Sequence, residues 1–253
     1  PSLDIRGWGE INAINGPIWS LMFEYVANIL YATVVRHFSK VVLTAFVTAS
    51  ALMTVDICLN IDVFGILAPR SSAAYTVIGG FGMSWEQLYI GVGRLLYPFF
   101  GGLLLYRLGW RLNIGRQGFL WLSVALMAIM AMPHLGGDTP NIANGLFCAV
   151  AILLLFPAIV AAGAGSPLAG RRMLPFCKWL GAISYPLYIT HYPLIYMQMS
   201  WASRHPDAPL STHIWVAVSI LIVAIAIAYA CLKVYDEPVR QWLTDRFLRR
   251  NKS

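Results

Sequence analysis

The chain has 253 residues, of which 58% are hydrophobic and only 11% are charged. Soluble globular proteins carry roughly 25% charged residues, so this composition excludes an ordinary water-soluble domain. The formal net charge of +7 does not indicate a nucleic-acid partner, because the Lys and Arg residues lie in short clusters between long apolar blocks. The lipid bilayer is therefore the environment in which we expect the chain to fold.

Seven apolar segments have the length and composition of membrane-spanning helices, or come close to it. In chain order they are 17–35, 41–59, 88–106, 118–132, 142–164, 179–199 and 214–235. The fourth is short, because its helix would extend only about 22 Å. Pro98, Pro186 and Pro193 lie inside the third and sixth segments and predict helix kinks. The expected fold class is all-α: a polytopic transmembrane helix bundle of about seven spans, with residues 1–253 forming a single transmembrane domain.

The orientation follows from the distribution of Lys and Arg between alternate connections. Most of them lie on one side of the predicted spans: Arg36, Lys40, Arg107, Arg111, Arg116, Arg171, Arg172, Lys178, Arg240, Arg246, Arg249, Arg250 and Lys252. The opposite connections hold only Arg6, Arg70 and Arg204. Because cytoplasmic segments are enriched in positive charge, the C-terminus is predicted to be cytoplasmic and residue 1 extracytoplasmic.

The long outer connection, residues 60–87, is rather apolar and contains Gly79, Gly80 and Gly82. A passive linker of this length is uncommon, and a lid, a re-entrant segment and a plain loop are all consistent with its composition. Asp56, just before it, is interpreted as a helix-end residue rather than as a proton carrier.

Three ionisable residues are predicted to lie deep in the membrane: Glu24, Arg94 and His191. Each falls roughly 9–12 Å from the outer edge of its segment at 1.5 Å per residue. An ionised side chain at the bilayer centre costs about 2.5–3.5 kcal/mol on insertion scales, so each should face protein or a water-filled cavity. Their equal depth predicts an ion pair between Glu24 and Arg94.

Each of these residues belongs to a polar stripe at helical spacing. The stripes are Ser20, Glu24, Asn28 and Tyr31 in the first segment, Arg94, Tyr97 and Gly101 in the third, and Ser184, Tyr188, His191 and Gln198 in the sixth. Three polar faces at one depth predict a shared cavity. Structural alternatives stay open at this point: a Glu–Arg pair that only fixes helix packing, and a His191 that is only a satisfied interior histidine. No His or Cys spacing predicts a metal site.

The residues around these positions resemble a known family. Residues 15–25, NGPIWSLMFEY, resemble the N-x-x-x-W-S-L-x-x-E segment of the bacterial acyltransferase 3 family, the group of O-antigen acetylases and related membrane acyltransferases. Residues 93–102, GRLLYPFFGG, resemble its R-x-x-x-x-F-F-x-G helix, and residues 183–193, ISYPLYITHYP, resemble its S-Y-x-L-Y-x-x-H-x-P helix. Glu237 and Pro238 resemble its closing segment.

The resemblance implies a multi-pass enzyme of the inner membrane with ten helices. Such an enzyme moves an acyl group, here expected to be acetyl, from cytoplasmic acyl-CoA to an extracytoplasmic sugar or lipid-linked glycan, with no permanently bound cofactor. The segments found here would be the last seven of the ten, and three helices are expected before residue 1. The catalytic histidine proposed for the family lies in an R-x10-H motif that residues 1–253 lack, so this stretch alone is expected to be inactive.

The polar stripes and the resemblance together indicate which residues form the site. Glu24 and His191 are expected to support catalysis, and the expected substrate-binding residues are Trp19, Ser20, Asn28, Arg94, Tyr97, Ser184 and Tyr188. No nucleophile-elbow motif indicates a covalent intermediate. Two alternatives belong to other classes: a transporter or exporter that uses the same buried charges, and an inactive fragment that serves as a scaffold.

Overall fold

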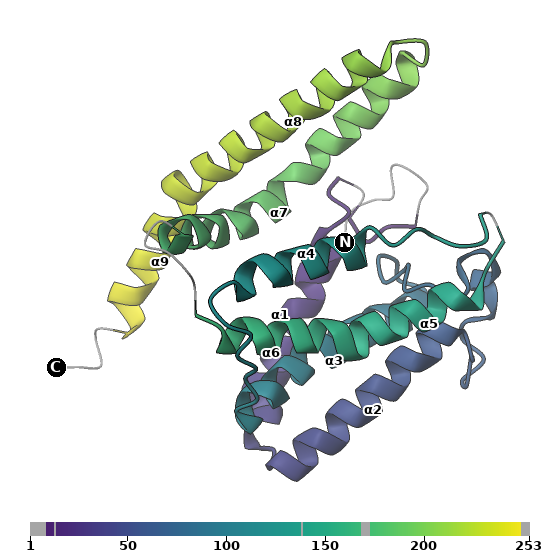
Figure 1. The fold of residues 1–253 in the computed structure, drawn as a ribbon, viewed down its shortest axis with the longest axis vertical. Coiled ribbons are helices and arrows are strands. Elements are labelled where there is room, and N and C mark those ends of the chain that lie inside the picture. The colour runs from purple at the N-terminus through teal and green to yellow at the C-terminus, as the bar shows by residue number, and fades with distance from the viewer. Residues whose placement is uncertain (1–8, 13, 138, 168–172, 249–253) are drawn as a thin grey trace. The chain divides into compact units, whose positions relative to one another are not determined.

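The structure is a computed structural model, and its described part forms helices and no strands (Figure 1). The residues it describes are 9–12, 14–137, 139–167 and 173–248. They form two compact units. Unit 1 holds the described residues of 1–13 and 19–170, and unit 2 holds those of 14–18 and 171–253. The expected all-α fold class is confirmed.

Unit 1 is built around the packing of two long helices, α2 and α3. Its helices are α1 (Ile18–Thr33, from Trp19 on), α2 (Lys40–Leu59), α3 (Trp85–Leu108), α4 (Gly118–Met130), α5 (Ile142–Val150) and α6 (Phe156–Gly165), with the short 3-10 helices Val35–His37 and Ala68–Ala73. A π-helical turn, Ala151–Leu155, makes α5 and α6 one continuous helix. Phe100 of α3 is fully buried against Leu43 and Val47 of α2, and α5 packs on the same helix α2.

Polar side chains fix where the apolar helices of unit 1 begin. Ser39, Ser84 and Asn141 each precede a helix, and each side chain accepts a hydrogen bond from a backbone N–H of the first turn. Such caps satisfy donors that have no partner inside the helix. At the other ends, Asn60 and Gly109 adopt positive φ angles of 49° and 70° and terminate α2 and α3.

Unit 2 is a helical hairpin. Helix α7 (Met173–Arg204) and helix α8 (Leu210–Cys231) lie side by side, joined by a short turn (Figure 1). A π-helical turn, Leu232–Asp236, continues α8 into α9 (Glu237–Leu243), and a last π-helical turn covers Thr244–Leu248. Residues 14–18 belong to this unit, so the start of α1 is grouped with the hairpin.

The predicted segments coincide with the observed helices. Each of the seven lies on a helix of the described chain. Four helices are long and apolar enough to cross a membrane: Lys40–Leu59, Trp85–Leu108, Ile142–Gly165 and Leu210–Phe247. Helix α4 is as short as expected, because its 13 residues extend only about 20 Å. The count of seven spans stays a prediction.

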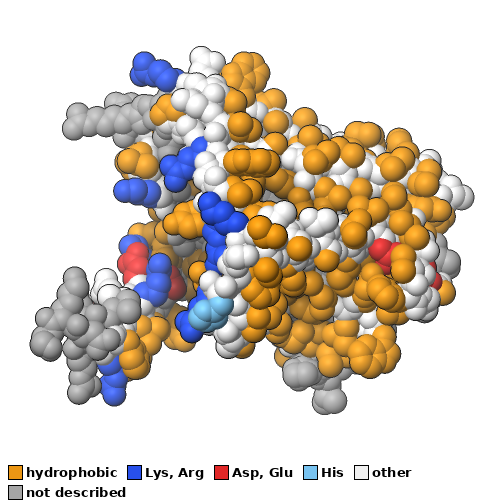
Figure 2. All heavy atoms as spheres, turned by 90° about the horizontal axis from the view of Figure 1, so that it is seen from below, with side chains coloured by type: hydrophobic (Ala, Val, Ile, Leu, Met, Phe, Trp, Pro, Cys, Tyr) orange, Lys and Arg blue, Asp and Glu red, His pale blue; other side chains and the backbone are white. Residues whose placement is uncertain are grey.

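Large hydrophobic side chains lie on the outside of the described helices. Trp121 of α4, Leu154 of the continuous α5–α6 helix and Ile222 of α8 are each about 60% exposed. Figure 2 shows hydrophobic side chains over most of the visible surface. A soluble protein rarely exposes apolar patches beyond a few hundred Å², whereas helices that contact lipid tails expose such side chains as a rule.

Glycine allows α1 and α3 to approach each other closely. A Cβ atom on Gly91 of α3 would lie 2.4 Å from Cζ of Phe23, a buried residue of α1. Ala27, one turn further along α1, is also fully buried. The Phe23 ring therefore occupies the space that any side chain at position 91 would need.

We predict that Gly91→Ala destabilises the protein by about 1–3 kcal/mol, because the added methyl group overlaps the Phe23 ring. Gly102→Ala is the matched control: the same helix offers open space there, with no atom within 4 Å of the added Cβ. The control substitution should leave the free energy of unfolding unchanged or raise it by up to about 1 kcal/mol, because alanine has a higher helix propensity than glycine. Thermal unfolding in detergent measures both, and equal effects of the two substitutions would refute the close approach.

Candidate functional site

Arg94 of α3 connects three parts of unit 1. Its Nη1 donates a hydrogen bond of 2.6 Å to the carbonyl of Gly79, in the long connection before α3. Its guanidinium carbon lies 4.6 Å from the centroid of the Trp19 ring, on α1. A cation over an aromatic face at this distance is attracted to it, by about 0.5–2 kcal/mol depending on solvation. Two predicted substrate-binding residues, Trp19 and Arg94, are therefore in direct contact.

The backbone beside this contact requires glycine. Gly79 and Gly80 have φ angles of +133° and +96°, which other residues rarely adopt. A Cβ atom on Gly80 would also lie 2.9 Å from Cα of Gly91 and 3.0 Å from the Trp19 ring. The Gly80 N–H donates to Oε1 of Gln87. The glycines of the connection thus bring its backbone against α1 and α3.

Glu24 does not take the partner predicted for it. No ion pair joins Glu24 to Arg94 among the described residues, so that prediction is wrong. Phe23 and Ala27 define the face of α1 that packs inside unit 1, and Glu24 lies about 100° further around the helix. Arg94 instead reaches Trp19, and Glu24 is exposed on unit 1.

Two other residues of the α1 polar stripe, Asn28 and Ser20, are also at least partly exposed. Asn28 is also exposed on unit 1, and its amide donates to the backbone carbonyl of Glu24 at 2.8 Å. Ser20 is half-buried. Because an exposed carboxylate at membrane depth needs protein or water beside it, this stripe stays the candidate polar surface of α1.

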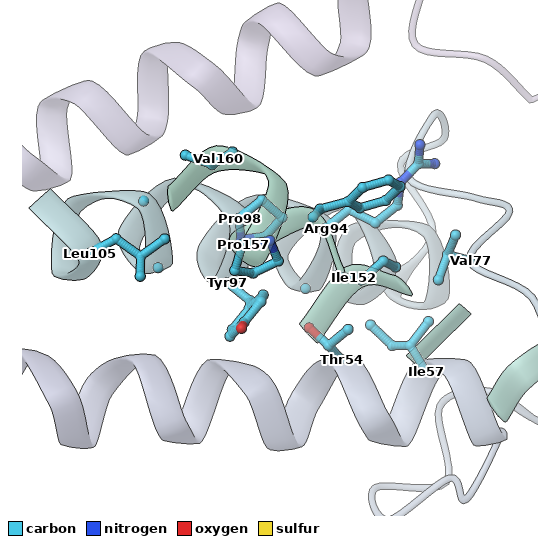
Figure 3. Close-up of a pocket in the computed structure, with 14 residues that line it drawn as sticks. Thr54, Ile57, Val77, Arg94, Tyr97, Pro98, Leu105, Ile152, Pro157 and Val160 are labelled. Carbon is cyan, nitrogen blue, oxygen red and sulfur yellow. The ribbon is translucent and has the colours of Figure 1, made fainter. Parts of the chain in front are cut away.

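A cavity of about 320 Å³ lies between α2, α3 and the α5–α6 helix (Figure 3). Its lining is mainly apolar and includes Thr54, Ile57, Val77, Gly93, Arg94, Tyr97, Pro98, Gly101, Gly102, Leu105, Ile152, Phe156, Pro157 and Val160. Figure 3 shows Pro98 and Pro157 at its middle, Arg94 at one end and Leu105 at the other. The two prolines and the two adjacent glycines leave space where longer side chains would fill the gap between the helices.

The hydroxyl of Tyr97, which lines this cavity, has a structural partner. It donates a hydrogen bond of 2.7 Å to the carbonyl of Leu153. Leu153 lies in the π-helical turn Ala151–Leu155, and Pro157, four residues later, has no N–H that could donate to its carbonyl. A donor from α3 therefore serves a carbonyl that cannot accept from residue 157.

The polar stripe of α7 lies in unit 2. Nδ1 of His191 is 2.9 Å from the carbonyls of Leu187 and Tyr188. Because carbonyl oxygens only accept, this contact requires a proton on Nδ1, and in the neutral imidazole Nε2 then carries the lone pair. Ser184 donates to the carbonyl of Gly181, at 2.8 Å.

Residues 14–18 contact α7 next to this stripe. The hydroxyl of Tyr188 donates to the carbonyl of Pro17 at 3.1 Å, and Nδ2 of Asn15 donates to the carbonyl of Ile189 at 2.6 Å. Within unit 2 the structure thus brings the first residue of the NGPIWSL motif to the turn that carries His191. The single cavity expected from α1, α3 and α7 involves both units and stays a prediction.

Comparison with known proteins decides the family. A family model described as an acyltransferase domain, Acyl_transf_3, matches residues 3–233. The chain belongs to the acyltransferase 3 family. No curated protein and no solved structure matched the chain. The resemblance seen in the sequence is thereby confirmed, and with its long apolar helices this acyltransferase family member is a membrane protein.

One buried residue of this acyltransferase 3 family member was not expected from the sequence. Arg70, in the connection between α2 and α3, is only 4% exposed. Its Nη2 donates to the carbonyls of Ala73, Thr76 and Ile78. Burial lowers the pKa of the Arg70 guanidinium, and the negative charge of Glu86 acts in the opposite direction.

The hydrogen bonds of Arg70 give the long connection a defined fold. Ile78, which accepts from Arg70, directly precedes Gly79, which accepts from Arg94. At the start of the connection, Asp56 accepts from the N–H of Val63 and from the hydroxyl of Tyr89, as expected of a helix-end residue. The sequence did contain one signal for this hydrogen-bonded arginine, namely an arginine inside an apolar, glycine-rich loop.

We predict that Tyr97→Phe destabilises the protein by about 1–3 kcal/mol, since it leaves the Leu153 carbonyl without a donor in apolar surroundings. In a Pro157→Ala background residue 157 supplies an N–H, and the loss caused by Tyr97→Phe should fall by at least about half. A double-mutant cycle by thermal unfolding in detergent measures this coupling.

Thr54→Val is the control for that cycle. Thr54 lines the same cavity and donates to the carbonyl of Ser50, which also has a donor within α2. The loss of stability caused by Thr54→Val should be small and should not change in the Pro157→Ala background. Strictly additive losses for Tyr97→Phe and Pro157→Ala would show that the Tyr97 hydroxyl does not serve the proline.

Proposed function

We propose that the protein transfers an acyl group, in the first instance acetyl, from cytoplasmic acyl-CoA to a hydroxyl group of an extracytoplasmic sugar or lipid-linked glycan. The match to the acyltransferase family over residues 3–233 is the observation that carries this proposal. The apolar helices agree with a multi-pass protein of the inner membrane. The positive-inside distribution of Lys and Arg supports a cytoplasmic C-terminus.

The proposed reaction is a direct displacement at a thioester. The acceptor oxygen attacks the carbonyl carbon, the new C–O bond of the ester forms, and the C–S bond to coenzyme A breaks. The proton leaves the acceptor hydroxyl during the attack and ends on the thiol of coenzyme A. Groups that accept hydrogen bonds at the acceptor hydroxyl therefore favour the reaction.

The α7 stripe has the hydrogen-bonding character that a sugar acceptor requires. Ser184, Tyr188 and His191 each direct a proton to a backbone carbonyl. Their oxygen atoms and Nε2 of His191 therefore face any further partner as hydrogen-bond acceptors. A carbohydrate presents many hydroxyl donors, so an acceptor-rich stripe complements it.

The remaining residues act as supporting groups in this proposal. Glu24 adds a further acceptor on α1 and, with His191, supports removal of the hydroxyl proton. Arg94, held by Gly79 and Trp19, supplies positive charge toward the outer ends of the helices, in the orientation predicted by the positive-inside distribution. Polar side chains that bind and orient the substrate complete the set: Ser20, Asn28, Tyr97, Ser184 and Tyr188.

We predict that His191→Gln and Glu24→Gln each lower acyl transfer by at least about tenfold in membranes from cells that express the full-length protein. The measurement is transfer of radiolabel from acetyl-CoA to envelope glycans. Thr33→Ala is the matched control, because Thr33 is an exposed α1 residue whose hydroxyl donates only to the carbonyl of Ile29. Its activity should equal that of the unmodified protein.

The same membranes distinguish the transporter alternative. Export of a glycan or its precursor without incorporation of label, lost on Glu24→Gln, would contradict acyl transfer and favour transport. Unchanged label transfer in both variants would remove Glu24 and His191 from the site.

A further inference from the structure

The geometry of unit 2 points to a role for Asn15 that goes beyond the proposed function and rests on it. We propose that Asn15 is a positioning residue for His191: its amide replaces the backbone donor that Pro193 removes from α7, and so holds the turn that carries the imidazole.

The first observation concerns the backbone of α7. In an α-helix the carbonyl of Ile189 accepts from the N–H of residue 193, and Pro193 has no N–H. An unsatisfied carbonyl in a membrane-spanning helix is costly, and such carbonyls are satisfied by neighbouring groups. Nδ2 of Asn15 donates to this carbonyl at 2.6 Å. Because the carbonyl only accepts, the facing atom must be the amide nitrogen.

The second observation is that Asn15 is built into this position. It is only 9% exposed, although it belongs to a short segment before α1. Two residues later, the carbonyl of Pro17 accepts from the hydroxyl of Tyr188, on the same turn of α7. The two hydrogen bonds run in opposite directions, one from the segment to α7 and one from α7 to the segment. Together they fix the segment against a single turn.

The third observation connects this turn to His191. The carbonyls of Leu187 and Tyr188 accept from Nδ1 of His191, and the next carbonyl, that of Ile189, accepts from Asn15. Side-chain donors are thus matched to three successive carbonyls of one turn. Without Asn15 the Ile189 carbonyl lacks both its helical donor and its side-chain donor. The turn must then rotate toward another donor, and this rotation changes the orientation of the His191 imidazole and of its Nε2 atom.

The proline makes the proposal testable by rescue. Pro193→Ala supplies the missing N–H inside α7, so Asn15 should become dispensable in that background. A role of Asn15 in packing alone would not depend on residue 193. Ser203→Ala is the matched control, because Ser203 donates to a carbonyl of the same helix twelve residues after His191, about 18 Å away.

The experiment compares Asn15→Ala, Pro193→Ala, the double variant and Ser203→Ala in the full-length protein. We expect Asn15→Ala to lower kcat for acetyl transfer about tenfold with less than about a twofold change in KM for acetyl-CoA. The double variant should recover most of the kcat of Pro193→Ala, and Ser203→Ala should keep the unmodified kcat. In detergent, Asn15→Ala should lower the melting temperature by about 3 °C, and by less in the Pro193→Ala background.

Two outcomes would overturn the proposal. Additive losses of melting temperature would show that Asn15 and Pro193 do not share the Ile189 carbonyl. Coupled melting temperatures with an unchanged kcat for Asn15→Ala would show a bond that does not position His191. If Asn15→Ala fails to fold, Asn15→Asp tests the same point, since it keeps the shape but loses the amide donor. Absence of acetyl transfer by the unmodified protein would refute the proposed function, whereas the melting-temperature cycle would still decide the Asn15 bond.

Discussion

Inside a bilayer every main-chain carbonyl needs a hydrogen-bond donor from the protein, and proline removes the donor that a helix would supply. Two carbonyls of this chain show how that need is met. Tyr97 donates to the carbonyl of Leu153, which cannot accept from Pro157, and Asn15 donates to the carbonyl of Ile189, whose α-helical donor Pro193 removes. The first bond joins α3 to α6 beside the cavity of unit 1. The second joins the segment before α1 to the His191 turn in unit 2.

Close approach between helices is the second requirement that shapes the candidate site. The glycines at 80 and 91 let the Trp19 and Phe23 rings of α1 lie against the backbone around α3. Arg94 then stacks on Trp19 and donates to the backbone next to the glycines, in a connection that the buried Arg70 holds in place. An aromatic face and a backbone carbonyl are among the groups that stabilise this cation.

The sequence predicted the positions of the helices better than the contacts between individual residues. Long apolar runs bounded by capping residues such as Ser39 and Ser84 specify where helices begin, so the predicted segments coincide with the observed helices. The family motifs were also sufficient to identify the family. Equal depth, by contrast, says nothing about rotation around the helix axis, and the predicted Glu24–Arg94 pair is wrong for that reason. The donor for Ile189 is 174 residues away in sequence, and no periodicity predicts it. Arg70 lies in a loop without a repeating pattern, so its burial could not be predicted from the sequence either.

The central claim is that side chains from elsewhere in the fold donate to two carbonyls that lie four residues before a proline, those of Leu153 and Ile189. A structure of the full-length protein in lipid nanodiscs, at a resolution that places side chains, tests it most directly. The account predicts that the amide nitrogen of Asn15 and the hydroxyl of Tyr97 each lie within about 3.2 Å of the carbonyls of Ile189 and Leu153. Side chains turned away from these carbonyls, with water or lipid in their place, would contradict it.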